Sequence, residues 1–132
     1  MTRRESREVA FIVIFEKMFQ KDLSLEEIFS FAKETDLFNA GGFAKELVKN
    51  VFDNLEEVDA IISDSLVGWS ADRLSKVSRS LLRLAVSELN YTDVPVGVAI
   101  NEAVEICKKY STEDDASYIN GVLATVAKKV RS

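Results

Sequence analysis

The chemistry that this sequence could perform begins with three arginines near its N-terminus. Arg3, Arg4 and Arg7 stand at helical spacing, and Phe11 and Phe15 follow them four residues apart. Guanidinium groups bind phosphates, aromatic rings stack on unpaired bases, and residues four apart share one side of a helix. The segment is therefore compatible with a surface for single-stranded RNA, although its spacing alone does not establish one. The alternative is that both phenylalanines are core residues and the arginines form a solvated helix end.

A second set of basic residues recurs every three or four positions in the second half. Its members are Arg73, Lys76, Arg79 and Arg83, opposite an apolar face of Leu74, Val77, Leu81 and Leu84. A solvated helix face or internal ion pairs explain most such stripes. Further along, Asn101 and Glu102 interrupt an apolar run, where polar side chains need partners. We expect Glu102 to pair with Arg83 and Asn101 to bond to backbone across a helix contact.

The residue types present give little support for catalysis or metal binding. Cys107 is the only cysteine, no histidine is present to activate it, and Ile106 and Ala103 place it near an apolar helix face. The acidic clusters at residues 56–59 and 113–115 suit a helix surface and a helix N-terminus. No glycine-rich phosphate-binding loop occurs. We therefore expect no enzyme activity, no metal site and no cofactor.

Charge limits how strongly the chain could bind a polyanion. The 132 residues carry a net charge of −5. Residues 1–8 hold three Arg and two Glu, and residues 123–132 hold two Lys and one Arg, so the rest of the chain carries −9. RNA binding would have to use the basic ends, and the chain alone should bind weakly. The single cysteine and the absence of a signal peptide or membrane-spanning run favour the cytoplasm.

These side chains are positioned by helices, because helical periodicity recurs and strand alternation does not. Thr2 with Glu5 and Ser24 with Glu27 have capping-box spacing, and Thr112 with Asp115 resembles a shortened box. Pro95 suits the first turn of a helix. The expected helices cover residues 2–20, 24–33, 43–67, 74–89, 95–109 and 112–130, with a bend at residues 53–54.

The expected fold is all-α, with six or seven helices and no sheet. Its single domain (1–132) divides at the glycine-containing breaks 39–42 and 68–71. An N-terminal half of three helices (1–67) and a C-terminal half (68–132) would form two small abutting bundles, because short connections favour antiparallel neighbours.

Three ordered motifs in the second half resemble those of one known family. They are the strings Val77–Leu89 (VSRSLLRLAVSEL), Val94–Ile106 (VPVGVAINEAVEI) and Tyr118–Leu123 (YINGVL). Together with the arginine-rich start, they resemble the NusB family of transcription antitermination factors over essentially the whole chain. The resemblance implies an all-helical fold of two bundles. It also implies pairing with the ribosomal protein NusE, binding of boxA-type single-stranded nascent RNA, and assembly on RNA polymerase in ribosomal RNA operons.

The resemblance also implies roles for particular residues. The RNA-binding set comprises Arg3, Arg4, Arg7, Phe15, Asp114 and Tyr118, and the partner-binding set comprises Ser78 and Arg79. Independently of the resemblance, we assign structural polar roles to Arg83, Asn101, Glu102 and Asn120. The family usually has Tyr and Gln where this chain has Phe15 and Ile12, which retains stacking and removes two polar groups. It commonly has an acidic residue where this chain has Ser78, which removes a candidate salt bridge. Tyr118 is expected to be an exposed stacking ring.

Alternative functions belong to different classes. The same helical domain occurs fused to RNA cytosine methyltransferases as an RNA-binding module, and this chain could be a stand-alone relative. It could also be a helical scaffold that binds a NusE-like protein without RNA. Some family members dimerise, so a homodimer is a further expectation.

Overall fold

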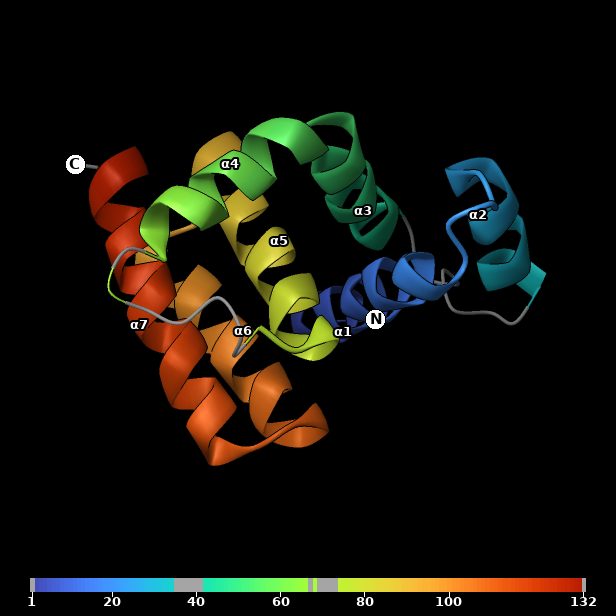
Figure 1. Ribbon diagram of the computed structural model, residues 1–132. Coiled ribbons are helices and arrows are strands. Elements are labelled where there is room, and N and C mark those ends of the chain that lie inside the picture. The colour runs from blue at the N-terminus through green and yellow to red at the C-terminus, as the bar shows by residue number, and fades with distance from the viewer. Residues whose placement is uncertain (1, 35–41, 67, 69–73, 132) are drawn as a thin grey trace.

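Seven helices account for most of the part of the chain that the structure describes (Figure 1). The computed structural model describes residues 2–34, 42–66, 68 and 74–131. The helices are α1 (Arg3–Phe19), α2 (Leu25–Glu34), α3 (Phe43–Asp53), α4 (Leu55–Ser65), α5 (Lys76–Tyr91), α6 (Val96–Tyr110) and α7 (Glu113–Val130). No strand occurs in these ranges, and the all-α prediction is confirmed. None of the helices described is long and apolar enough to cross a membrane.

Local capping interactions fix where three helices begin. Thr2 and Glu5 form the expected capping box, in which each side chain accepts a hydrogen bond from the other's backbone N–H at 3.0 Å. Ser24 and Glu27 make the same reciprocal pair at the start of α2. Thr112 accepts from the N–H of Asp115 and starts α7. Such caps satisfy N–H groups that lack partners within the helix, so the short-range pattern is sufficient to predict them.

The predicted long helix over residues 43–67 is two helices that meet at Asn54. This residue has φ −124° and ψ 24°, outside the helical region, and its side-chain amide donates to the carbonyl of Asn50 at 2.9 Å. The bend expected at Asp53–Asn54 is therefore a complete break. Gly68 follows α4 with a φ of +88°, which glycine adopts without steric cost. The other predicted break residues, 39–41 and 69–71, lie outside the described ranges.

The core is organised around α5, which packs against α1, α3, α4, α6 and α7 (Figure 1). Its apolar side chains are almost entirely inaccessible, namely Leu81, Leu82, Leu84, Ala85, Val86 and Leu89. Because neighbours surround this helix, its polar residues are buried as well, including Ser78, Ser80, Ser87 and Glu88. Buried polar groups need partners, so α5 sets the polar contacts of the surrounding helices.

Candidate nucleic-acid interface

The three N-terminal arginines occupy different environments on the first turns of α1. Arg3 and Arg4 are exposed, and the Arg4 side chain is 62% exposed. Arg7 is only 5% exposed. It shares a helix face with Ala10, Phe11 and Ile14, which stand three, four and seven residues further along and are buried in the core. Helix α1 thus turns one arginine inward and leaves two for solvent.

Arg7 forms a buried ion pair with Glu88 of α5. Its Nε lies 3.0 and 3.1 Å from the two carboxylate oxygens, and a terminal nitrogen lies 2.9 Å from Oε1. Burial raises the pKa of the Glu88 carboxyl, while the hydrogen bonds and charge of Arg7 act in the opposite direction. The expectation that Arg7 is exposed for phosphate binding is therefore wrong. The two residues are 81 positions apart, so only the packing of α1 on α5 could reveal the pair.

The two exposed arginines have partners from other helices. The Nε of Arg4 donates to Oε2 of Glu102 on α6 at 2.9 Å. The guanidinium carbon of Arg3 lies 3.7 Å from the ring centroid of Phe43 on α3, a cation–π contact. Both contacts hold the guanidinium groups near the surface, where solvent and ligands can still reach them.

The predicted pair between Glu102 and Arg83 is wrong. Arg83 instead donates to both carboxylate oxygens of Asp59 on α4, each at 2.9 Å. Asn101 is exposed and does not lie in a packed helix contact, contrary to expectation. The face on which a residue lies does not identify its partner, because the neighbouring helix decides which side chain lies opposite.

An aromatic row runs along α1 and continues onto the end of α6. Its ring centroids are 5.0 Å apart for Phe19 and Phe15, 6.0 Å for Phe15 and Phe11, and 5.1 Å for Phe11 and Tyr110. Phe11 is buried, which matches the alternative of a core residue. Phe15 is half-buried, whereas Phe19 and Tyr110 are 59% and 40% exposed. The row thus has a packed centre and accessible ends.

Sequence reasoning missed the two exposed ends of this row. Phe19 continues the four-residue spacing of Phe11 and Phe15, so the signal was present in the sequence. Tyr110 lies on a different helix and reaches the row only through tertiary packing. Exposed aromatic rings in series can stack on successive bases with little dependence on base identity.

A second ion pair lies beside Tyr110. The Nζ of Lys109 donates to both Glu8 oxygens at 2.9 Å, and the Tyr110 hydroxyl donates to Glu8 at 3.1 Å. The hydrogen bond and charge of Glu8 raise the pKa of Lys109. Glu8 and Glu102 thus each neutralise one exposed cation of this surface. Phosphate groups would have to replace these carboxylates as partners.

The α7 residues do not form the expected aromatic surface. Tyr118 is 2% exposed and packs in the core cluster, so the expectation of an exposed stacking ring is wrong. Tyr118 stands one residue before Ile119 and four before Val122, both fully buried, on a helix that packs against α4, α5 and α6. Asp114 is exposed in the first turn of α7. Asn120 is also exposed.

The residues assigned to a protein partner differ in accessibility. Ser78 is fully buried, and its hydroxyl has no hydrogen-bond partner within the described structure. Direct contact between this side chain and another protein is therefore excluded while the fold stays intact. Arg79, one position further, is partly accessible beside a cavity.

The described residues contain few side chains arranged for catalysis or metal binding. No cluster of three or more metal-ligating side chains occurs there. Cys107 is fully buried, and burial together with the charge of Asp115 raises its thiol pKa to about 11. The thiol is therefore protonated at neutral pH and unsuited to nucleophilic attack.

Comparison with known proteins assigns this arrangement to one family. The family model described as "NusB family" matches residues 4–128. The transcription antitermination protein NusB of Acetivibrio thermocellus is 44% identical over 130 residues, covering 97% of this chain and 90% of the relative. The corresponding protein of Pseudothermotoga lettingae is 46% identical over 133 residues, covering 97% and 93%.

Solved structures show the same similarity. NusB of T. maritima superimposes with a TM-score of 0.84 at 35% identity, covering all of this chain and 94% of that one. A structure described as the antitermination factors NusB and NusE in complex with dsRNA matches with a TM-score of 0.81 at 31% identity, covering 96% of both chains. The chain belongs to the NusB family.

Proposed function

We propose that this protein is a transcription antitermination factor that binds boxA-type RNA together with NusE. The observation that carries the proposal is the match over 96% of both chains to a NusB in complex with NusE and RNA. The α1 surface that includes Arg3, Arg4 and Phe15 supports it, since its exposed guanidinium groups and its half-buried ring can receive phosphates and a base. Phe19 and Tyr110 extend this surface.

The ion pairs of the surface give the proposal a mechanism for partner dependence. Arg4 and Lys109 are already neutralised by Glu102 and Glu8, so RNA must displace two carboxylates to bind them. The net charge of −5 adds a repulsive field. NusE would supply the additional contacts that make binding tight, and the chain alone should bind RNA weakly.

Variants of Arg4 and Glu102 should change RNA affinity in opposite directions, which provides a test. RNA affinity is measured by fluorescence anisotropy with a labelled boxA-like single strand, with and without NusE. Arg4→Ala should weaken binding and flatten its salt dependence by about 0.7 in log–log slope, the share of one phosphate on a single strand. Glu102→Gln should strengthen binding, because it releases Arg4 from its carboxylate. Lys49→Ala, at an exposed position on α3, is the matched control.

Two outcomes would contradict the proposal. One is equal RNA affinity with and without NusE, which would remove the reason for a complex. The other is loss of affinity in both Arg4→Ala and Glu102→Gln, which would make the ion pair itself, and not the free guanidinium, the requirement. NusE binding without any RNA binding would instead identify a protein-only scaffold.

A further inference from the structure

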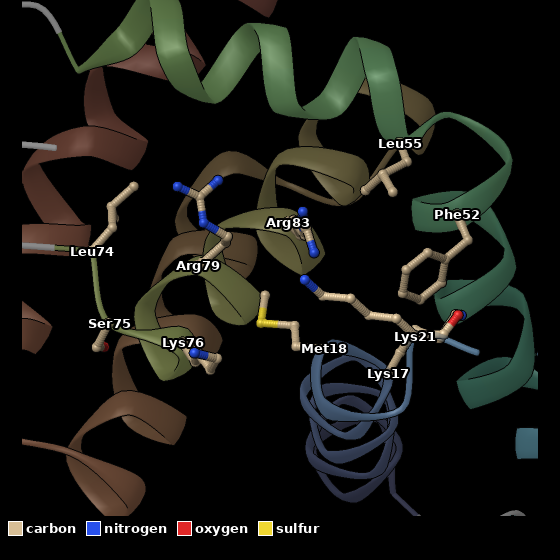
Figure 2. Close-up of a pocket in the computed structure, with 10 residues that line it drawn as sticks. All are labelled: Lys17, Met18, Lys21, Phe52, Leu55, Leu74, Ser75, Lys76, Arg79 and Arg83. Carbon is tan, nitrogen blue, oxygen red and sulfur yellow. The ribbon is translucent and has the colours of Figure 1, made fainter. Parts of the chain in front are cut away.

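A cavity of about 470 Å³ lies where the C-terminal end of α1 meets α5 and the junction of α3 and α4 (Figure 2). Its lining residues come from widely separated segments, namely Lys17, Met18, Lys21, Phe52, Leu55, Leu74, Ser75, Lys76, Arg79 and Arg83. Its volume falls in the range of small-ligand sites, roughly 300–1,000 Å³. The exposed arginines of the proposed RNA surface lie in the first turn of α1, so the cavity stands at the opposite end of that helix.

Of the lining residues that the structure describes, five are cationic and none is acidic. Arg83 is neutralised by its two hydrogen bonds to Asp59. The Nζ of Lys17 donates to the carbonyls of Lys21 and Leu23, at 3.2 and 2.7 Å, and so retains its charge. Among the described residues, the site therefore concentrates about four positive charges without an acidic partner, within a chain of net charge −5.

Lys21 and Arg79 are the cations best placed to receive a ligand. Neither forms an ion pair with any residue that the structure describes. They stand on opposite sides of the cavity, Lys21 after the end of α1 and Arg79 on α5 (Figure 2). The first turn of α5, which begins at the Ser75 cap, contains no acidic residue, so its positive dipole end also favours an anion.

The remaining lining residues are mostly apolar. They are Met18, Phe52, Leu55 and Leu74, with the hydroxyl-bearing Ser75; Phe52 and Leu55 lie together at the α3–α4 junction, and Leu74 lies on the side of Arg79 (Figure 2). A simple anion would leave these apolar side chains uncovered, and an apolar molecule would leave the cations without counter-charge. The ligand that satisfies both sides carries several negative charges at one end and a flat, weakly polar ring at the other.

We propose that this cavity binds a nucleotide, with its phosphates between Lys21 and Arg79 and its base against the wall of Met18, Phe52 and Leu55. The same chemistry is available from two sources, a free nucleoside triphosphate and a nucleotide within an RNA strand. Lys76 connects the site to the aromatic row, because its Nζ lies 5.4 Å from the centroid of the exposed Phe19 ring.

The test uses the full chain and separates the two sources. Binding of ATP carrying an N-methylanthraniloyl fluorophore is measured by anisotropy, with competition by ATP, pyrophosphate, adenosine and a single-stranded RNA hexamer. ATP should compete better than pyrophosphate, and adenosine worst. Lys21→Ala and Arg79→Ala should each weaken binding about tenfold, the effect of losing one hydrogen bond to a charged group. Lys108→Ala, at an exposed site on α6, should leave it unchanged.

The results distinguish free nucleotides from RNA as the ligand, and some results would overturn the proposal. Competition by ATP at lower concentration than the hexamer assigns the site to free nucleotides. Stronger competition by the hexamer, lost in Lys21→Ala and Arg79→Ala but retained in Arg4→Ala, assigns it to RNA. The proposal is overturned if no probe binds, if all three alanine variants bind alike, or if an acidic peptide displaces the fluorophore better than ATP. Thermal unfolding of each variant verifies that the fold is intact.

Discussion

Removal of the Arg7 guanidinium should strongly destabilise the fold. The Arg7 and Glu88 side chains are only 6% and 2% exposed, and they share three contacts of 2.9–3.1 Å. In Arg7→Ala, the Glu88 carboxylate would stay buried without a partner. Breaking a buried ion pair in this way costs about 3–5 kcal/mol. A domain has only about 5–15 kcal/mol of total stability, so a loss of this size would lower the urea midpoint markedly.

The pH dependence of this loss has a definite sign. Burial already raises the pKa of Glu88 in the folded protein, and loss of Arg7 removes the main influence that opposes the rise. Between the unfolded and the folded pKa, the folded protein then binds more protons than the unfolded chain, so stability increases as the pH falls through this window. The destabilisation by Arg7→Ala should therefore be greatest at neutral pH and smaller near about pH 5.

Urea unfolding followed by circular dichroism at these two pH values measures the effect. The double variant Arg7→Ala/Glu88→Gln should recover part of the lost stability at neutral pH, because it removes the buried charge. Arg4→Ala is the matched control, since its exposed pair with Glu102 should contribute only about 0.2–1 kcal/mol. A loss below about 1 kcal/mol in Arg7→Ala, or an equal loss at both pH values, would refute the reasoning.

Two further predictions concern buried side chains in the C-terminal half of the chain. Tyr118→Ala should lower the free energy of unfolding by about 3–5 kcal/mol in urea titrations, because the residue is only 2% exposed. Ser117→Ala, at the exposed neighbouring position, is the control and should lower it little. Equal losses in the two variants would contradict the burial of Tyr118. Cys107, with its pKa raised to about 11, should react with iodoacetamide at least about tenfold more slowly in the folded protein than in urea, as followed by mass spectrometry. Labelling at the same rate in both states would show that the thiol is accessible.

Helix identity and most helix ends were predictable because they depend on neighbours in the sequence. The Thr2–Glu5 and Ser24–Glu27 caps each join residues three positions apart. The same holds for the bend at Asn54, whose side chain bonds four residues back. The motifs resembling NusB likewise indicated the family before any contact was known. Local hydrogen bonds and periodic apolar residues fix a helix with little help from the rest of the chain.

The arrangement of the candidate RNA surface depends on contacts between helices, which the periodicity of apolar residues in the sequence does not encode. Arg7 and Arg4 stand three residues apart on one helix, yet one is buried against Glu88 and the other is exposed beside Glu102. Tyr118, at the edge of an apolar stripe, could have faced either environment. The width of the buried stripe depends on how many helices pack against it, and α7, which carries Tyr118, packs against α4, α5 and α6. Residues close together in the chain are thus enough to specify the helices, their caps and the family motifs. Only the packing of distant helices sets which charges are buried, which aromatic rings reach solvent and where the cationic cavity forms.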